Sequence, residues 1–335
     1  MTNFDVIIVG AGVAGSATAI EAASRVHRVA LLHYPKSRTS WESLPPWGWR
    51  ELRRLSIDLG TGFERVMAWW DSEREQVAHY PNACVLDGSE LARRLRQRAE
   101  TAGVAILRSD RRLSFARSPD GWRLQGLDAV SRVHSHITSH HVVDATGRNA
   151  TLGRRLGARR VSHDRLVSLS VAIRPCGVAG TWTETVAFGW WNVCSSGLQG
   201  TATFIASPET IRHTRGRLRD AFRQTAHLSE MFELAEAHPV LRPCGSSRLL
   251  PCAGPGWWAV GDAAWTAQPL ASCGIAKSLA DAHQFSIAVS QAATYDLLQS
   301  ERFNRYLREL KSQYDAGRSA ANASKHDSDP HPTGS

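Results

Sequence analysis

The sequence has no long hydrophobic run, no closely spaced cysteine pair and very little lysine. No segment approaches the roughly 18 consecutive apolar residues that a membrane-spanning helix needs, so we expect no contact with a membrane. The six cysteines are scattered without a C-x-x-C pair, which argues against a zinc ribbon and favours a reducing compartment. The N-terminus enters a strand pattern at once, without a basic region or cleavage site, so we expect no signal peptide and a cytoplasmic protein.

Lysine supplies only four of the 40 basic residues, and the formal net charge is +9. A basic surface could attract an anionic substrate or an acidic polypeptide. A general preference for arginine on solvated faces would explain the same composition. No basic patch interleaved with aromatic residues and no nucleic-acid-binding motif accompanies the charge, so we expect no nucleic-acid partner.

Three strand-to-glycine-turn junctions lie far apart in the sequence and have the same character. They read FDVIIVGAG, HHVVDATG and GWWAVGDAA. A nucleotide-binding sheet interrupted by insertions would produce this pattern. We therefore predict an α/β fold with a discontinuous Rossmann-like cofactor domain and an inserted mixed-sheet substrate domain.

The predicted boundaries follow from the same pattern. The cofactor domain comprises residues 1–60, 87–163 and 245–292, the substrate domain comprises 61–86 and 164–244, a C-terminal helix covers 293–315, and 316–335 form a disordered tail. Within these domains we expect helices over 50–58, 89–102 and 208–237, with caps at Ser89 and Ser207, and a β-meander over 113–143.

The GAGVAG turn places Gly10, Gly12 and Gly15 in G-x-G-x-x-G spacing between a strand and a helix. The first glycine permits the tight turn, the second lets backbone N–H groups approach a pyrophosphate, and the third lets the helix pack closely on the strand. The pattern predicts dinucleotide binding; the alternative is a glycine-rich turn with no ligand.

A second motif, GWWAVGDAAWTAQPLASCGI, spans residues 256–275. Asp262 at the strand end could accept a hydrogen bond from a ribitol or ribose hydroxyl. The helix N-terminus near Ser272 could face an electron-rich ring edge.

This segment resembles the G-D-A-A…P…G-I signature of FAD-dependent monooxygenases with the para-hydroxybenzoate hydroxylase-like fold. VVDATGRNATLGRRLGA, residues 142–158, is similar to their D-A-T-G-R turn. WESLPPWGWRELRRL (41–55) and FGWWNVCSSG (188–197) resemble segments of one branch. That branch is related to flavin-dependent tryptophan halogenases and includes flavoproteins that oxidise side chains of partner proteins during quinone-cofactor biogenesis.

The resemblance implies FAD as the cofactor, with NAD(P)H or a flavin reductase as the electron source. The FAD-binding residues that it implies are Gly10, Gly12, Val13, Ala14, Gly15, His33, Tyr34, Ser43, Leu44, Asp144, Gly147, Gly261, Asp262, Pro269, Ser272, Gly274 and Ile275.

Several positions depart from the family pattern. His33 stands where the family has a glutamate for the adenosine ribose, and a neutral histidine offers only one acceptor nitrogen. Trp41, Gly88 and Gln268 replace a glycine, an arginine and an acidic residue. These changes predict weaker FAD binding or an unusual partner. The basic residues His33, Lys36 and Arg38 leave open a ribose 2′-phosphate, and hence NADP.

The resemblance implies a monooxygenase that hydroxylates an indole- or phenol-like substrate, free or on a peptide or protein, through a flavin C4a-hydroperoxide. Glu42 is the candidate acid or base, although a structural contact near Arg50 would explain it equally well. Trp69, Trp190 and Trp191 are candidates for the substrate pocket. Trp190 and Trp191 would point to opposite faces of a strand, and Trp69 and Trp70 repeat that pattern. Ordinary core packing is the alternative for all of them.

Other functions remain open. In flavin-dependent halogenases, a lysine directs hypochlorous acid to the substrate. No lysine lies between Lys36 and Lys277 in this sequence, which weighs against that mechanism. A flavin-dependent dehydrogenase or reductase, or a degenerate flavoprotein acting as a binding partner, would fit the same motifs. A partner protein could close the active site. The histidines of VHSHITSHH have no carboxylate or cysteine at useful spacing, so we expect no metal.

Overall fold

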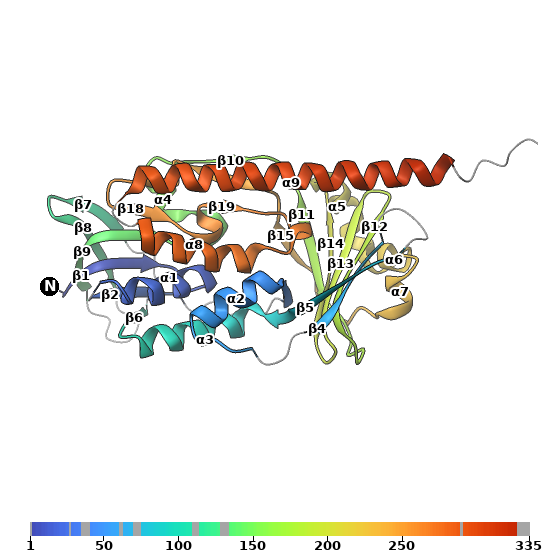
Figure 1. Ribbon diagram of the computed structural model, residues 1–335, viewed down its shortest axis with the longest axis horizontal. Coiled ribbons are helices and arrows are strands. Elements are labelled where there is room, and N and C mark those ends of the chain that lie inside the picture. Colours follow the sequence, from blue (N-terminus) through green and yellow to red (C-terminus); the bar gives the residue numbers. More distant parts are fainter. Residues whose placement is uncertain are drawn as a thin grey trace, which may run out of the picture. The chain divides into compact units, whose positions relative to one another are not determined.

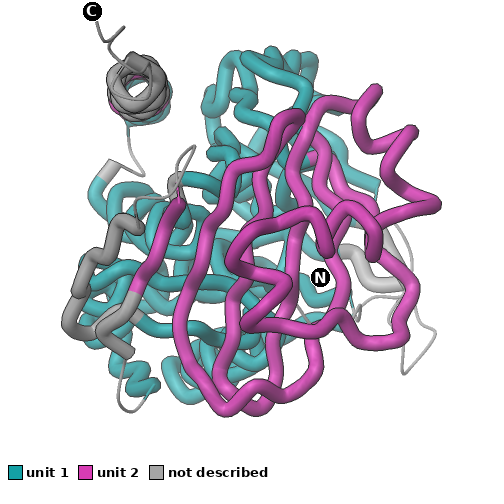
Figure 2. The backbone as a smooth tube through the Cα atoms, turned by 90° about the vertical axis from the view of Figure 1, so that its right-hand side faces the viewer, with its two compact units in different colours: residues 1–64, 80–166, 244–300 teal, residues 65–79, 167–243, 301–335 magenta. Residues whose placement is uncertain are grey.

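The computed structural model describes residues 2–26, 28–34, 41–59, 63–69, 75–108, 114–127, 134–288 and 291–326. The chain divides into two compact units (Figure 2). Unit 1 comprises residues 1–64, 80–166 and 244–300, and unit 2 comprises 65–79, 167–243 and 301–335. The excursion into unit 2 near residue 70 is therefore shorter than the predicted segment 61–86.

Unit 1 contains a sheet with the order β17-β18-β9-β1-β2-β6 (Figure 1). Its strands are β17 (Ala253–Gly254), β18 (Trp257–Ala259), β9 (His134–Asp144), β1 (Thr2–Val9), β2 (Val29–His33) and β6 (Ala105–Arg108). From β18 to β6 all neighbours are parallel. Ile7 and Ile8 point to opposite faces and are both wholly buried, as expected for a parallel sheet covered on both sides.

Helices and a meander complete this sheet. α1 (Val13–Ala23) packs against both α3 (Gly88–Thr101) and α8 (Gly274–Ala288). The predicted meander is confirmed as β7 (Ser114–Ser118), β8 (Gly121–Leu127) and β9. A small sheet of β10 (Arg159–Ser162), β16 (Ser247–Leu250) and β19 (Trp265–Thr266) also belongs to unit 1, as do α2 (Pro46–Arg54), η1 (Gly147–Asn149), α4 (Thr151–Arg155), η3 (Gly261–Ala263) and η4 (Pro269–Ala271).

Unit 2 is built on a mixed sheet with the order β15-β11-β14-β13-β12-β4-β5. These strands are β15 (Val240–Pro243), β11 (Val167–Ala172), β14 (Gly200–Ala206), β13 (Gly189–Ser196), β12 (Ala179–Val186), β4 (Phe63–Trp69) and β5 (Glu75–Asp87). β12 and β4 are parallel, whereas the pairs from β15 to β12 are antiparallel. The far end of β5 pairs with β3 (Trp41–Leu44) in unit 1.

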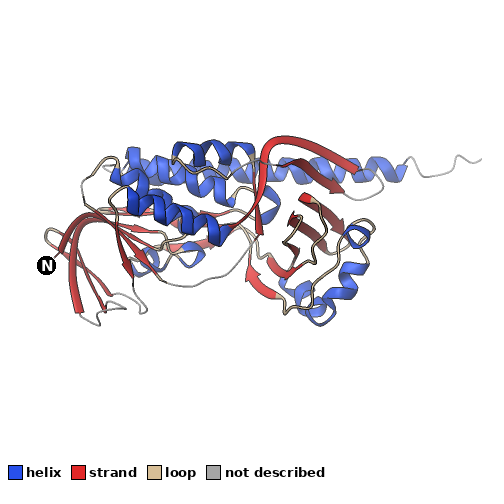
Figure 3. Cartoon of the chain, turned by 90° about the horizontal axis from the view of Figure 1, so that it is seen from below, coloured by secondary structure: helices blue, strands red, loops and turns tan. Residues whose placement is uncertain are grey.

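The short helices α5 (Pro208–Thr214), η2 (Arg215–Arg217), α6 (Leu218–Arg223) and α7 (Leu228–Met231) lie on one side of this sheet (Figure 3). Trp182, Trp191, Phe204 and Phe222 form part of the core on that side. The Ser207 cap is confirmed, since Ser207 Oγ accepts a hydrogen bond from Thr210 N at 3.2 Å.

Three helix predictions were wrong in detail. α2 begins at Pro46 rather than 50, because proline is favoured in the first turn of a helix. The cap of α3 is Asp87, whose Oδ1 accepts from Ser89 N at 2.8 Å, so Ser89 is a donor and not the cap. The segment 208–237, predicted to be helical, contains three short helices and a 3₁₀ turn, and residues 232–237 are not helical.

The C-terminal helix is also longer than predicted. α9 runs from Ala292 to His326, so residues 316–326 are helical rather than disordered. Four alanines in this stretch favour the helix despite its scarcity of apolar residues. Residues 327–335 lie outside the described part. Among the described helices, none combines the length and the apolar character required to cross a bilayer.

Candidate functional site

The carboxyl ends of the parallel strands of unit 1 are aligned in one row. Val9 pairs with Leu32 and with Asp144, and Asp144 pairs with Ala259. The three glycine turns that follow these strands therefore emerge at the same edge of the sheet. In open α/β sheets, ligands bind in the crevice outside this edge.

The glycines of the first turn have three different surroundings. Gly10 has φ +111°, and a Cβ on it would lie 2.3 Å from Ala145 O in the second turn. A Cβ on Gly15 would lie 1.8 Å from Gly10 O, so this glycine sets the close approach of α1 to the turn. A Cβ on Gly12 would meet no protein atom within 4 Å, and Gly12 is exposed at the N-cap of α1. Gly12 is thus the one open to a ligand.

The second turn is organised by Asp144, which is completely buried. Its Oδ1 accepts from Thr146 N at 2.9 Å and from Thr146 Oγ1 at 2.6 Å, and its Oδ2 accepts from Gly153 N at 2.8 Å. Both carboxylate oxygens therefore serve the turn itself. The side chain of Asp144 therefore shapes the turn, and a contact between this residue and a cofactor stays a prediction that would fall to its backbone.

The third turn, at Gly261–Ala263, is held by two cations, the buried Lys277 and the partly buried Arg160. Lys277 Nζ donates to Gly261 O at 2.8 Å, and Arg160 donates to Asp262 O at 3.0 Å and to Ala263 O at 2.7 Å. The carbonyl oxygens of residues 261, 262 and 263 therefore all accept hydrogen bonds from these two side chains. A Cβ on Gly261 would lie 2.4 Å from Ala14 Cβ, so this turn lies against the first turn of α1.

An ion pair supports the same turn. Lys277 Nζ lies 2.8 Å from Asp281 Oδ2, one helical turn along α8, and both side chains are almost completely buried. Asp281 Oδ2 also accepts from Gly261 N at 3.0 Å, and Lys277 Nζ lies 4.3 Å from the centre of the Trp265 ring. Arg160 has no such ion-pair partner among the described residues. Burial lowers the pKa of its guanidinium to about 10, although the nearby carboxylate of Asp262 acts to raise it. Arg160 therefore stays charged at neutral pH.

The end of β2 is cationic rather than acidic. Burial lowers the pKa of His33, and the neighbouring guanidinium groups of Arg96 and Arg108 lower it further, so this ring is neutral at pH 7. Arg96 also reaches the first turn, where its Nη1 donates to Ala11 O at 3.1 Å. The surroundings thus favour a phosphate-bearing ligand near the ribose position. Lys36 and Arg38 lie outside the described residues.

The remaining residues predicted to bind FAD all lie in unit 1. Leu44 is completely buried, so only its backbone could contact a ligand, whereas Ser43, Tyr34 and Gly147 are partly exposed. Pro269 begins η4 and Ser272 follows it in the left-handed conformation, with φ +44°, which redirects the chain into α8 at Gly274. Ile275 is buried. Glu42 is exposed on β3.

The three tryptophans predicted to line a substrate pocket separate onto two faces of the unit 2 sheet. Trp191 is wholly buried against Phe204 and Phe222, and Trp69 is buried and stacks on His227 at 4.6 Å. Both belong to the core beneath the helices, which corrects their placement at a pocket. Trp190 points to the opposite face, and its buried Nε1 has no hydrogen-bond partner among the described residues. Trp70 lies outside the described residues.

The face that carries Trp190 is rich in hydrogen-bonding groups. Asn192 Nδ2 lies 3.0 Å from Thr183 Oγ1, and Ser170 Oγ lies 3.0 Å from Thr203 Oγ1. These short polar side chains alternate with the apolar side chains of the helix-covered face, as the two-residue period of a strand requires.

The described side chains contain no group of three histidine, cysteine, aspartate or glutamate residues suited to a metal ion. His141 is partly buried and meets the Trp258 ring edge-on, with ring centres 5.2 Å apart, so it packs at the edge of the unit 1 core. The side chains of His134 and His136 lie outside the described part.

Sequence reasoning missed Arg160, Asp281 and the structural role of Lys277. A lysine and an aspartate four residues apart in a predicted helix are a recognisable signal for a pair. That pattern is common on exposed helix faces, however, so only the burial distinguishes this one. Nothing in the local sequence of Arg160 points to a turn about 100 residues away.

No protein-family model and no curated protein sequence matches the chain. Solved structures resemble it in fold. A flavin-dependent brominase is 18% identical with a TM-score of 0.75, and the match covers 90% of this chain and 84% of the brominase. Peptidyl tryptophan dihydroxylase QhpG, which is essential for tryptophylquinone cofactor biogenesis, is 21% identical with a TM-score of 0.74, covering 91% and 72%. A flavoprotein/dehydrogenase from Cytophaga hutchinsonii is 14% identical with a TM-score of 0.78, covering 97% and 87%.

At these identities the likeness establishes the fold. The chain has the Rossmann-type α/β fold of FAD-dependent halogenases, hydroxylases and reductases, which confirms the predicted fold class and the predicted branch of structural relatives.

Proposed function

We propose that the protein is an FAD-dependent monooxygenase that hydroxylates an aromatic substrate. The observation that carries the proposal is the meeting of three glycine turns at one edge of the unit 1 sheet, where Gly12, at the N-cap of α1, has open space in place of a side chain. This arrangement suits the pyrophosphate of a dinucleotide, because the N-terminus of α1 favours negative charge there.

The residues fit FAD in distinct ways. The backbone around Gly12 and Val13 would bind the pyrophosphate, and the partly exposed carboxylate of Asp262 would accept from a ribitol hydroxyl. Arg160 and Lys277 fix the turn that presents Asp262. Gly274 and Ile275 begin α8, whose N-terminus would lie toward the electron-rich edge of the flavin ring.

Bound FAD would supply two-electron chemistry and the reaction with dioxygen. The protein's part is to bind, orient and exclude water. We assign the substrate side to the sheet face that carries Trp190, Asn192 and Thr183, where an indole ring lies beside hydroxyl and amide groups. Such a face suits an aromatic ring that bears a polar group, whether it is a free molecule or a side chain.

A test of this function has two stages. The purified protein should show a flavin absorption band near about 450 nm, either as isolated or after addition of FAD. Turnover with isotopically labelled dioxygen and an aromatic substrate should then place one labelled oxygen atom in the product. Oxidised product without labelled oxygen would instead identify a dehydrogenase, and loss of all flavin binding would contradict the proposal.

Halogenation is disfavoured by the position of Lys277. Its ammonium group is almost completely buried and bonded to Asp281 and Gly261, so it cannot direct an oxidant to a substrate. Adding bromide or chloride to the turnover reaction should therefore leave the product unhalogenated.

A further inference from the structure

A cavity of about 300 Å³ lies within unit 2, on the side of its sheet that carries the helices. Its apolar walls come from Val171, Leu218, Leu234, Ala237 and Pro239, and its remaining walls come from the stretch Arg215–Asp220 and from Arg223. It is therefore separate from the glycine turns of unit 1 and from the sheet face that carries Trp190.

The rim of this cavity carries an excess of positive charge. Between residues 212 and 223 the chain has five arginines and one aspartate. Only Arg223 has an acidic partner among the described residues, Asp220 at 3.3 Å, and both side chains are well exposed, so this pair contributes little. The facing loop, residues 232–239, carries the exposed carboxylates of Glu233 and Glu236, and Glu233 pairs with Arg174. The arginines of the rim therefore outnumber the carboxylates that could neutralise them.

Arg219 is fixed without being neutralised. Its Nη1 donates to Leu234 O at 3.1 Å and its Nη2 donates to Ala235 O at 2.7 Å. Both acceptors are neutral carbonyl groups, so the charge of the guanidinium remains available to a ligand while its position is set. Arg215 and Arg217 are exposed and make no hydrogen bond or ion pair within the described part of the chain.

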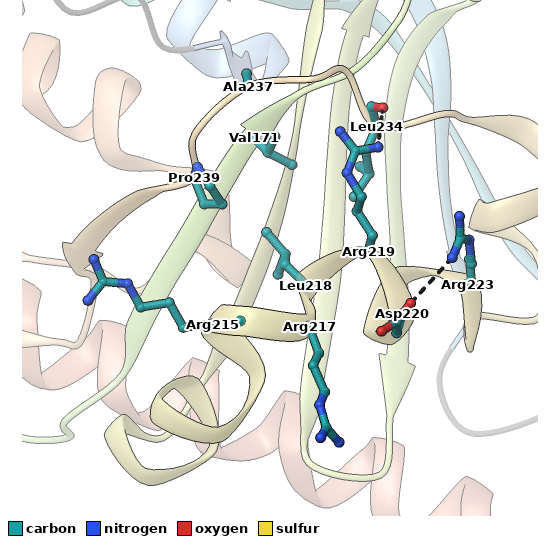
Figure 4. A pocket seen from close by; sticks show the side chains of 11 residues that line it. Val171, Arg215, Arg217, Leu218, Arg219, Asp220, Arg223, Leu234, Ala237 and Pro239 are labelled. Atoms are coloured by element: carbon teal, nitrogen blue, oxygen red, sulfur yellow. Dashed lines mark hydrogen bonds and ion pairs between the residues drawn. The ribbon is translucent and has the colours of Figure 1, made fainter.

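The arrangement of these arginines decides the kind of ligand. Figure 4 shows Arg215, Arg217 and Arg223 extending away from the cavity in different directions, with the guanidinium of Arg219 lying along its edge. A single small anion could not reach several of them at once. An extended chain with several carboxylates could, while one apolar side chain entered the cavity. No aromatic residue lines the cavity, so it offers no stacking surface for a nucleic-acid base.

We propose that this cavity is a docking site for an acidic peptide segment of a partner polypeptide, with one aliphatic side chain in the cavity and carboxylates on the surrounding arginines. The inference is independent of flavin binding and of the reaction. It adds a binding surface on the opposite side of the unit 2 sheet from Trp190.

The test uses the full chain and a fluorescein-labelled acidic peptide with a single leucine at its centre, read by fluorescence anisotropy. Reversing the charge of two exposed arginines, with the double variant Arg215→Glu and Arg217→Glu, should weaken binding of the peptide by about ten-fold or more. The matched control is Arg123→Glu with Arg165→Glu, two exposed arginines in unit 1 that change the net charge equally; it should leave the affinity within about two-fold.

A second variant tests the cavity itself. Ala237 is exposed and lines the cavity, so Ala237→Trp should fill it without changing any charge. The variant should bind the leucine peptide more weakly and no longer distinguish it from a peptide with glycine at the centre. Equal binding by both charge-reversal variants, or single-stranded DNA competing as well as the peptide, would overturn the proposal. Thermal unfolding of each variant establishes that it is folded.

Discussion

Lys277 and Asp281 bind the two polar groups of one residue, Gly261: the ammonium group donates to its carbonyl oxygen at 2.8 Å, and the carboxylate accepts from its N–H at 3.0 Å. The pair thus fixes the backbone of the turn that presents Asp262. Because both charges are buried, each depends on the other.

Removing one partner of this pair should be costly. Lys277→Met leaves the carboxylate of Asp281 buried without its cation, and we expect unfolding to become easier by about 3–5 kcal/mol. The double variant Lys277→Met with Asp281→Asn keeps an acceptor for Gly261 N and should recover part of the loss. Urea denaturation measures both changes.

An exposed ion pair provides the control for that experiment. Arg174 and Glu233 lie 3.3 Å apart with more than half of each side chain exposed, so Arg174→Ala should cost less than about 1 kcal/mol. A loss for Lys277→Met as small as that of Arg174→Ala would show that the buried pair does not stabilise the turn.

Below neutral pH, the free energy of unfolding should depend on the protonation of His33 and His141. Burial lowers the pKa of both rings below 6.5, with arginines adding to the effect at His33 and His140 adding to it at His141, where Asp5 opposes it. The unfolded chain therefore takes up these protons at higher pH than the folded chain. Stability is present above about pH 6.5 and falls as the pH decreases.

Thermal unfolding between about pH 7.5 and pH 5 measures this dependence. The double variant His33→Gln with His141→Gln should lose less stability over the same range than the unchanged chain. An equal slope in the two proteins would show that these rings do not contribute.

How far the sequence predicts this molecule depends on whether the signal is local. The G-x-G-x-x-G turn, the β-meander and the Ser207 cap are set by neighbouring residues, and all three were predicted correctly. The alternation of Trp190 and Trp191 predicts two faces but not which face the helices cover. That choice depends on packing against Phe222 and Phe204, so Trp191 was wrongly placed at a pocket.

The sequence also failed to predict which groups the polar side chains of the turns bind. Asp144 has the position of a ligand-binding aspartate, yet the backbone N–H of Gly153 and the Thr146 side chain occupy its oxygens. Arg160 reaches the carbonyls of residues 262 and 263 only because the two segments meet in the folded chain. The partners of Asp144 lie only two and nine residues along the chain, whereas those of Arg160 lie about 100 residues away, where local spacing gives no signal.

Replacing His33, which is predicted to lie at the ribose of the cofactor, tests the cationic end of β2. His33→Glu restores a carboxylate that can bridge two hydroxyl groups, and Arg96 and Arg108 lie close enough to keep it ionised. We expect FAD to bind about ten-fold more tightly. Isothermal titration calorimetry with FAD and with NADP would decide the ligand, since tighter NADP binding by the unchanged protein would favour the 2′-phosphate alternative.

The two neighbouring tryptophans should respond differently to truncation. Trp191→Ala removes a wholly buried ring from the unit 2 core and should cost about 3–5 kcal/mol in unfolding free energy. Trp190→Phe keeps an aromatic ring and removes the N–H that has no partner among the described residues together with part of the indole, so we expect a smaller loss of about 1–2 kcal/mol.

The activity of Trp190→Phe then separates packing from recognition. If Trp190 contacts the substrate, the variant should show a raised KM with little loss of stability. An unchanged KM and kcat would show that the substrate does not contact Trp190, which contradicts its assignment to this face of the sheet.

The central claim, that the first glycine turn binds FAD, is tested most directly by titrating FAD into the unchanged protein, Gly12→Ala and Gly15→Ala, with the flavin absorption band as the readout. Gly12→Ala adds a methyl group where no protein atom lies within 4 Å and where φ is −77°, so the fold should be retained with a loss below about 1 kcal/mol. Gly15→Ala places a Cβ against Gly10 O and should destabilise the protein by about 1–3 kcal/mol. The account predicts that the unchanged protein binds FAD and that Gly12→Ala, although stable, binds it at least about ten-fold more weakly. Equal FAD affinity in the unchanged protein and Gly12→Ala, or no FAD binding by either, would contradict it.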